Sequence, residues 1–241
     1  MKNQWFGDIH DFRKYGLLTF LSKFYNDVYV DWMLTEDIPD TKDGKIIKYA
    51  SKHRRYYWAP LTTSEIQKQI WDYLHHFHFN SNKNRHVSYG MEILSKMNNN
   101  CNFFSSLDYN WESMFCVQPQ ICNRLIFFDA DNGLANNIPN KKIMKNADSH
   151  YISVDKVEQY LRNQFSVLIY QHNTLSCLRP FSKLCRDCIQ TLSIDKEDIV
   201  IFKGGHVVYF LIEKRKNIQK EIIKKFESEK FSSKYLALFN I

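Results

Sequence analysis

Apolar and polar positions alternate along this chain with two spacings, one typical of helices and the other of buried strands. Helical spacing predicts helices that begin after Asp8, within 62–74, over 154–162, after Pro180 and over 218–229. Short apolar runs predict strands at 28–34, 125–128, 166–172, 198–202 and 206–212. A glycine pair at 204–205 separates the last two runs and predicts a β-hairpin.

These elements predict an α/β fold: a Rossmann-like, mostly parallel sheet with helices on both faces and an antiparallel hairpin at one edge. With 241 residues, 44% of them hydrophobic, we expect a single α/β domain over 1–241. Residues 45–122 look mainly helical and predict a helical insertion or cap within it. No run approaches the roughly 18 apolar residues of a membrane span. Because no signal-peptide core follows Met1, a cytoplasmic protein with no membrane partner is expected.

The charge balance favours nucleic acid as a binding partner. Basic residues outnumber acidic ones by 33 to 26, for a net charge of +7. Arg54 and Arg55 lie in a basic cluster followed directly by three aromatic residues, a composition suited to binding DNA or RNA through phosphates and stacked bases. The alternative is that these rings belong to the core and the basic run is its solvated edge. A protein partner or a second copy of the chain, docked on the apolar segment at 235–239, also stays open.

The apolar run at 125–128 ends in the most informative motif, Asp129-Ala-Asp131-Asn132-Gly133. In an open α/β sheet, ligands bind at the carboxyl ends of the strands. Two carboxylates spaced two residues apart can hold Mg²⁺, with Asn132 beside them as a substrate contact. The alternative is an Asx-type turn, because Asp, Asn and Gly are also common turn formers.

Two further segments carry candidate chemistry. In the first predicted helix, Asp8, Asp11 and Tyr15 lie near one face as candidate substrate contacts, and Lys14 follows Asp11 by three residues. Lys14 suits a phosphate or a cofactor carboxylate, although Asp8 also suits a helix cap and Asp11–Lys14 an ordinary ion pair. The strand at 166–172 ends in Gln171, a candidate substrate contact, and in His172, which suits a general base or a metal ligand. The alternative is a strand-end histidine with a backbone partner.

Glycine-rich nucleotide loops and zinc motifs are not found. The first predicted strand runs into Asp31-Trp-Met-Leu, where a dinucleotide or S-adenosylmethionine loop would need glycine for close backbone approach. Six cysteines include one CxxC pair, Cys185 and Cys188, within a predicted helix. Their spacing matches no zinc finger, so buried helix positions are the favoured interpretation.

Five blocks, spread over most of the chain, carry a family resemblance: GDIHDFRKYGLL at 7–18, DWMLT at 31–35, DGK at 43–45, FDADNGL at 128–134 and LIYQH at 168–172. In this order they resemble an uncharacterised bacterial protein family of similar length. More distantly, the layout resembles ribosomal-RNA adenine-N6 methyltransferases with a degenerate cofactor loop. That resemblance implies cofactor contacts for Lys14 and Tyr15 and the catalytic-motif acid for Asp129. Asp129-x-Asp131 followed by Gly133 also resembles the metal-binding pair of the Toprim fold.

Three functions follow as hypotheses. The first is a Mg²⁺-dependent nuclease in which Asp129 and Asp131 hold the metal, His172 activates water and Lys14 stabilises the phosphate. The second is a DNA or RNA methyltransferase that uses S-adenosylmethionine with an atypical cofactor loop. The third is a non-catalytic, methyltransferase-like scaffold that binds nucleic acid or a protein.

Overall fold

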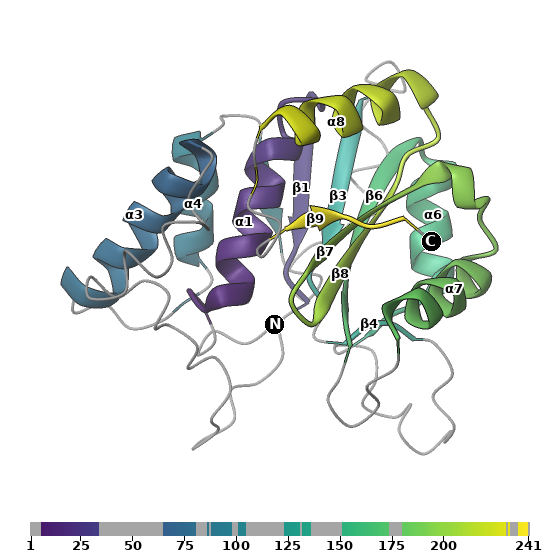
Figure 1. The fold of residues 1–241 in the computed structure, drawn as a ribbon, viewed down its shortest axis with the longest axis horizontal. Coiled ribbons are helices and arrows are strands. Elements are labelled where there is room, and N and C mark those ends of the chain that lie inside the picture. Colours follow the sequence, from purple (N-terminus) through teal and green to yellow (C-terminus); the bar gives the residue numbers. More distant parts are fainter. Residues whose placement is uncertain are drawn as a thin grey trace.

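The fold is mixed α/β, with a central, mostly parallel sheet between helices (Figure 1). The computed structural model describes residues 6–33, 65–80, 86, 88–97, 101–104, 123–130, 132–135, 151–173, 180–229, 231 and 236–240. The helices in this part of the chain are α1 (Ile9–Leu21), α3 (Glu65–Asn80), α4 (Ser88–Met97), α6 (Val154–Arg162), α7 (Phe181–Leu192) and α8 (Lys216–Ser228), with a 3₁₀ turn at Lys196–Asp198. None of the described helices is long and apolar enough to cross a membrane.

The main sheet has the strand order β2-β1-β3-β6-β8-β7-β9 among the described residues. Its strands are β1 (Asp27–Asp31), β2 (Cys101–Phe104), β3 (Arg124–Phe128), β6 (Phe165–His172), β7 (Ile199–Gly204), β8 (Val207–Ile212) and β9 (Ala237–Leu238). The first four strands of the order pair in parallel, whereas β8 is antiparallel to both β6 and β7. The predicted mostly parallel sheet and its antiparallel hairpin are therefore confirmed, but among the described residues β9, rather than the hairpin, forms that edge of the sheet.

Several boundaries differ from the predicted ones. The first strand ends at Asp31 rather than continuing to residue 34, and the strand at 165–172 begins one residue earlier than expected. Residues 101–104, inside the segment expected to be mainly helical, form β2 and pair in parallel with β1. Part of the C-terminal segment expected as an interface, Ala237–Leu238, instead forms β9 and pairs with β7. These last two pairings join strands that lie far apart in the sequence, so the spacing of neighbouring residues did not indicate them.

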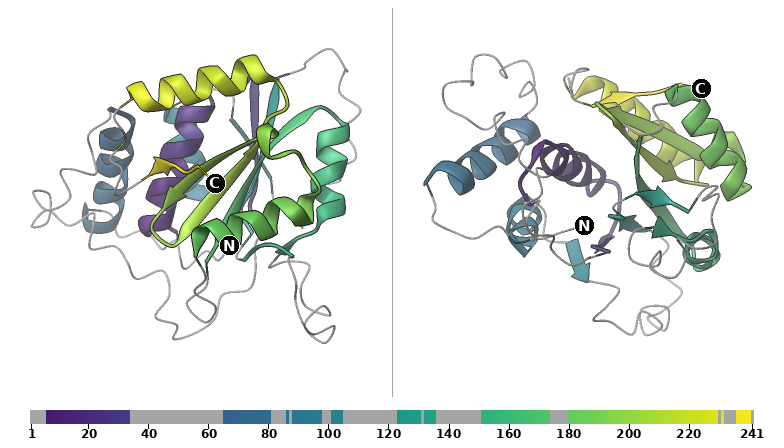
Figure 2. Two further views of the ribbon diagram at one scale, coloured as in Figure 1. Left: turned by 45° about the vertical axis from the view of Figure 1, so that its right-hand side comes forward. Right: turned by 90° about the horizontal axis from the view of Figure 1, so that it is seen from below.

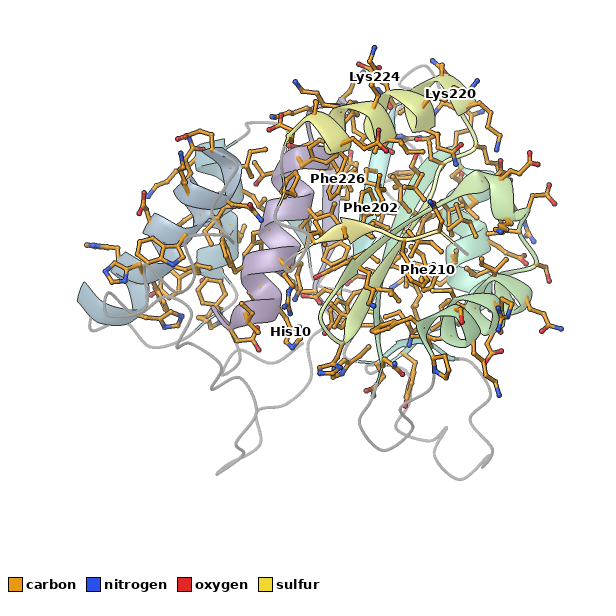
Figure 3. The ribbon with its side chains drawn as sticks, in the orientation of Figure 1. His10, Phe202, Phe210, Lys220, Lys224 and Phe226 are labelled. Carbon is orange, nitrogen blue, oxygen red and sulfur yellow. The ribbon has the colours of Figure 1, made fainter. Side chains whose placement is uncertain are left out.

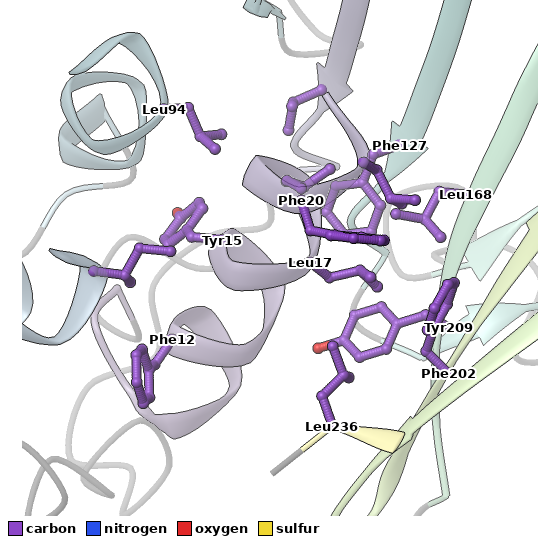
Figure 4. Packing of buried hydrophobic residues seen from close by; sticks show 14 of the residues in the cluster. Phe12, Tyr15, Leu17, Phe20, Leu94, Phe127, Leu168, Phe202, Tyr209 and Leu236 are labelled. Atoms are coloured by element: carbon purple, nitrogen blue, oxygen red, sulfur yellow. The ribbon is translucent and has the colours of Figure 1, made fainter. Parts of the chain in front are cut away.

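Two hydrophobic clusters lie on opposite faces of the sheet, because neighbouring side chains of a strand point to opposite sides. In β3, Leu125 and Phe127 belong to the first cluster, whereas Ile126 and Phe128 belong to the second. Helices α1 and α8 cover the first face, and α6 and α7 cover the second (Figure 2). Figure 4 shows α1 side chains, among them Leu17 and Phe20, turned toward the sheet residues Phe127 and Tyr209. Because β3 is covered on both faces, it is apolar from Leu125 to Phe128.

Candidate functional site

The candidate site lies where the strand order changes direction. From β1, the sheet continues through β2 on one side and through β3 on the other. Such a switch point leaves a crevice at the carboxyl ends of the two adjacent strands, which is the usual ligand position in open α/β sheets. Asp31 is the last residue of β1 and Asp129 follows β3, and the Asp129 backbone N–H donates to the Asp31 carbonyl oxygen at 3.0 Å. Two acids therefore stand side by side at this point.

Lys14 of α1 connects the helix to this edge of the sheet. Its Nζ lies 2.7 Å from Oδ2 of Asp129 and 2.9 Å from Oδ1 of Asp11, and none of the three side chains is more than 4% exposed. The same Nζ lies 5.4 Å from the ring centroid of Tyr170, within cation–π range. The structure thus brings Lys14, Asp11 and Asp129, three of the predicted site residues, into one buried ion cluster.

The start of α1 explains why Lys14 is held there. Asp8 caps the helix, because its Oδ1 accepts from the backbone N–H groups of His10 and Asp11. The Asp11 carboxylate accepts from the Gly7 N–H at 2.6 Å, and Gly7 adopts the left-handed conformation (φ 81°) that glycine tolerates best. His78 of α3 donates from Nε2 to the Gly7 carbonyl oxygen at 2.6 Å. The cap and the candidate site are therefore one hydrogen-bonded structure.

Burial perturbs the ionisable groups of this cluster. Burial alone would lower the pKa of the Lys14 ammonium, but Asp11 and Asp129 overcome it and raise that pKa well above its ordinary value. The pKa of Asp129 is raised by burial, although Lys14 opposes the change. Burial, and then the neighbouring Asp11 charge, raise the pKa of Asp8 to about 7. Among the described residues, the carboxylates of Asp8, Asp11 and Asp129 share the Lys14 ammonium, so the cluster carries excess negative charge when they are all ionised.

Gln171 holds the loop that follows Asp129. Its Nε2 donates to the Asn132 carbonyl oxygen at 2.8 Å, and its Oε1 accepts from the Leu134 N–H at 2.9 Å. Between these contacts, Gly133 has φ 82°, and an added Cβ would lie 2.7 Å from the Tyr170 carbonyl oxygen. Gly133 and Leu134 then form β4, which pairs with β5 (Tyr151–Ile152) in a separate two-stranded sheet. Gln171, predicted as a substrate contact, is buried and uses its amide to position this loop.

His172 is the last residue of β6, which lies beside β3 in parallel. The predicted base therefore lies at the same edge of the sheet as Asp129. Its ring is 5.8 Å from that of His10 on α1, measured between centroids.

The end of β1 is occupied by a second buried ion pair that the sequence did not suggest. Asp31 is fully buried, and its Oδ2 lies 2.8 Å from Nζ of Lys156, a half-buried residue of α6. The next two residues, Trp32 and Met33, are also buried. Lys156 is separated from Asp31 by 125 positions, so no local spacing could have paired them.

Other predicted site residues lie apart from this edge or outside the described residues. Tyr15 is buried against α4, since a Cβ on Gly90 would lie within 3 Å of its phenol ring and would meet its hydroxyl. A helix places positions 14 and 15 on different faces, and the role of Tyr15 as a substrate contact stays a prediction. Asp131, Arg54 and Arg55 lie outside the described residues. Cys185 and Cys188 are buried in the core as α7 residues, as expected.

The part of the chain that the structure describes holds no group of three or more His, Cys, Asp or Glu side chains arranged to bind a metal ion. Comparison with protein-family models, with curated proteins and with solved structures finds no match to this chain.

Proposed function

We propose that the protein is a Rossmann-like nucleic-acid methyltransferase that modifies an exocyclic amino group of a base. The observation that carries the proposal is the buried Lys14–Asp129 pair at the switch point between β1 and β3. This is where an open α/β sheet binds its ligands. The resemblance to adenine-N6 methyltransferases assigns the catalytic-motif acid to the same residue, Asp129.

The arrangement of the elements supports this class. The resemblance implies an opening helix with a lysine, a first strand ending in an acid, a later strand with the motif acid, and a terminal hairpin. In this chain Lys14 of α1 bonds Asp129 after β3, Asp31 ends β1, and β7 and β8 form the hairpin. In this interpretation α3 and α4, which lie beside α1, are the helical insertion (Figure 1).

The acceptor side of the reaction is assigned to Asp129. Lys14 bonds Oδ2 and holds the carboxylate in one orientation, and we assign Oδ1 to the amino group of the base. A hydrogen bond from that amino group would orient its nitrogen toward the methyl donor. As the new N–C bond forms, the S–C bond of the sulfonium would break, the donor would leave as a neutral thioether, and the nitrogen would release one proton to water. Because Asp129 is buried, the base must leave its stack to reach it, as in other enzymes that act on a base.

The donor side fits S-adenosylmethionine through charge. This molecule carries a sulfonium and an ammonium group, and when bound it supplies an electrophilic methyl group. Such a cation would stabilise the ionised forms of Asp8 and Asp129, whose pKa values are raised by burial, since opposite charges attract strongly where water is excluded. Trp32 and Met33 follow β1 at the position where ordinary cofactor loops have glycine, so the backbone cannot approach a cofactor closely there. We therefore assign the contacts with the donor to side chains, those of Asp8 and Asp31.

A metal-dependent nuclease is the second candidate, favoured by the position of His172 at the same edge as Asp129. The carboxylates that attract a sulfonium would also attract Mg²⁺. We rank this function below methyl transfer because the described residues include only one of the two carboxylates assigned to the metal, Asp129. Asp131, the other assigned ligand, lies outside the described residues.

The two candidates are separated by one set of assays on the purified chain. Single-stranded and double-stranded DNA and RNA are incubated with radiolabelled S-adenosylmethionine, in EDTA or in Mg²⁺, and both methyl incorporation and strand cleavage are measured. We expect methyl incorporation in EDTA, lost in Asp129→Asn and kept in Asp72→Asn, an exposed control on α3. Cleavage that needs Mg²⁺ and is lost in Asp131→Asn would support the nuclease instead. Nucleic-acid binding with neither activity would overturn both proposals and support the scaffold.

A further inference from the structure

Four basic side chains from three separate elements gather beside the ion cluster. His10 and Arg13 come from α1, His172 ends β6, and His206 lies in the turn between β7 and β8. The His10 and His172 rings are 5.8 Å apart between centroids. A Cβ on Gly205, in that turn, would lie 2.9 Å from Nη1 of Arg13, so the guanidinium packs directly against the turn that carries His206.

These side chains differ from the ion cluster in their exposure. Asp8, Asp11, Lys14 and Asp129 are all buried, whereas His10, Arg13 and His172 are only partly buried and His206 is exposed. The edge of the sheet therefore has an inner acidic layer and an outer basic layer. A nucleotide has the complementary arrangement, since its phosphate is anionic and the amino group of its base donates hydrogen bonds.

We propose that His10, Arg13, His172 and His206 form a phosphate-binding site on the outer side of the Lys14–Asp129 pair. Arginine presents a charged, planar set of donors that suits phosphate oxygens, and the imidazoles add further N–H donors. The phosphate site stands on the side-chain geometry alone. Only the identity of the phosphate's bearer, a nucleic-acid backbone, rests on the proposed function. In that role the site would hold the backbone while the base reaches Asp129.

The mutual repulsion of these groups supports the assignment. Burial, and then the charges of Arg13, His172, Lys14 and His206, lower the pKa of His10 to about 3. A bound phosphate would counteract this repulsion, because its negative charge attracts the basic side chains. An anion would therefore stabilise their close arrangement. The other ionisable groups that face it are Asp8 and Asp11 from α1, Asp129 after β3, Tyr170 from β6 and Tyr209 from β8.

The other basic surface of the described residues is less suited to phosphate. Helix α8 carries Lys220 and Lys224 at the end of the molecule opposite His10 (Figure 3). Lys216 and Lys225 of the same helix already form ion pairs with Asp198 and Glu229. This surface has mixed charge and lies far from Asp129, so it cannot position a base there.

The test compares two double variants of the full chain that lose the same side-chain types. Arg13→Gln with His206→Gln removes two members of the site, and Arg186→Gln with His76→Gln removes an exposed arginine and an exposed histidine elsewhere. Affinity for a fluorescein-labelled single-stranded oligonucleotide is measured by anisotropy at pH 7. We expect the site variant to weaken binding about tenfold or more. The control should change affinity less than about twofold.

Inorganic phosphate and a mononucleotide are used as competitors, because they present the same phosphate group without and with a nucleoside attached. Both should displace the oligonucleotide from the wild type and from the control, and weakly or not at all from the site variant. The single variant His206→Gln guards against misfolding, since His206 is exposed, and it should lower affinity in the same direction. Equal losses in the site and control variants would overturn the phosphate site while leaving methyl transfer intact. Phosphate competition in a wild type that transfers no methyl group would overturn the proposed function and keep the site.

Discussion

Replacing Lys14 by Met tests the buried ion cluster most directly, because Met keeps the length of the side chain and removes the ammonium. The ammonium lies 2.9 Å from Asp11 and 2.7 Å from Asp129, in side chains that are at most 4% exposed. Removing one partner of a buried ion pair leaves an uncompensated charge and costs about 3–5 kcal/mol. Since two carboxylates lose their partner here, we expect the free energy of unfolding to fall by about 4 kcal/mol or more near pH 8.

The cost should depend on pH in a defined direction. Burial already raises the pKa of Asp129, and Lys14 now opposes that change, so the variant should raise it further. A carboxyl group whose pKa is raised in the folded state binds its proton there preferentially. Stability therefore increases as the pH falls from the folded pKa toward the ordinary carboxyl pKa of about 4. The difference between the wild type and Lys14→Met should be largest near pH 8 and smaller at pH 5.

Urea unfolding, followed by circular dichroism at pH 8 and pH 5, measures both effects. The matched control is Lys23→Met, because Lys23 is 44% exposed and its Nζ lies 3.2 Å from Glu229. That variant should lose at most about 1 kcal/mol, with little dependence on pH. Adding Asp129→Asn to Lys14→Met should recover part of the lost stability. An unfolding midpoint for Lys14→Met equal to that of the wild type at pH 8 would refute the ion-cluster argument.

Three further predictions test other parts of the structure. Gly133→Ala should destabilise the loop after Asp129 by about 1–3 kcal/mol and reduce methyl transfer, whereas Gly16→Ala, whose nearest new contact is 4.0 Å away, should preserve activity. Glu213→Gln should lower stability by about 2 kcal/mol at pH 7, measured by urea unfolding. Although burial opposes the change, hydrogen bonds from Arg215 and Ser166 lower the pKa of Glu213. The stability that the Glu213 carboxylate contributes should therefore disappear as the pH falls through that lowered pKa. An equal loss of stability in the variant at acid pH would contradict this expectation. Asp8→Asn keeps a capping side chain but removes a carboxyl whose pKa is about 7 in the folded state. Thermal stability should therefore fall less from pH 4 to pH 7 in the variant than in the wild type. Parallel stability profiles would show that Asp8 does not titrate in this range.

Elements with strong local signals were predicted well. Helix α6 occupies the predicted residues because Ser153 caps it and its apolar side chains repeat at helical spacing. The glycine pair predicted the β7–β8 hairpin, since the tight turn needs the positive φ that Gly205 adopts. The strand ending at Phe128 was visible as an apolar run. Each of these signals is contained within a few neighbouring residues.

The arrangement of the candidate site was predicted only in part. Asp11, Lys14, Asp129 and His172 were named from strand ends and helical spacing, but their mutual contacts depend on which strands are adjacent. The Lys14–Asp129 pair joins positions 115 apart. His10 and Arg13 were missed although both lie within one helical turn of Lys14, and that spacing was the available signal. The role of His206 depends on a turn that packs against Arg13, which no local pattern indicates.

The two acids at the switch point are held from opposite faces of the sheet. Asp129 is bonded by Lys14 of α1, and Asp31 by Lys156 of α6, although their backbones are joined directly. A displacement of either helix would therefore change the electrostatics at the carboxyl ends of β1 and β3 without altering Asp31 or Asp129 themselves. Over evolution, positions 14 and 129 should change together, as should positions 31 and 156. The charge at this edge of the sheet would then depend on residues of α1 and α6 as much as on the two acids themselves.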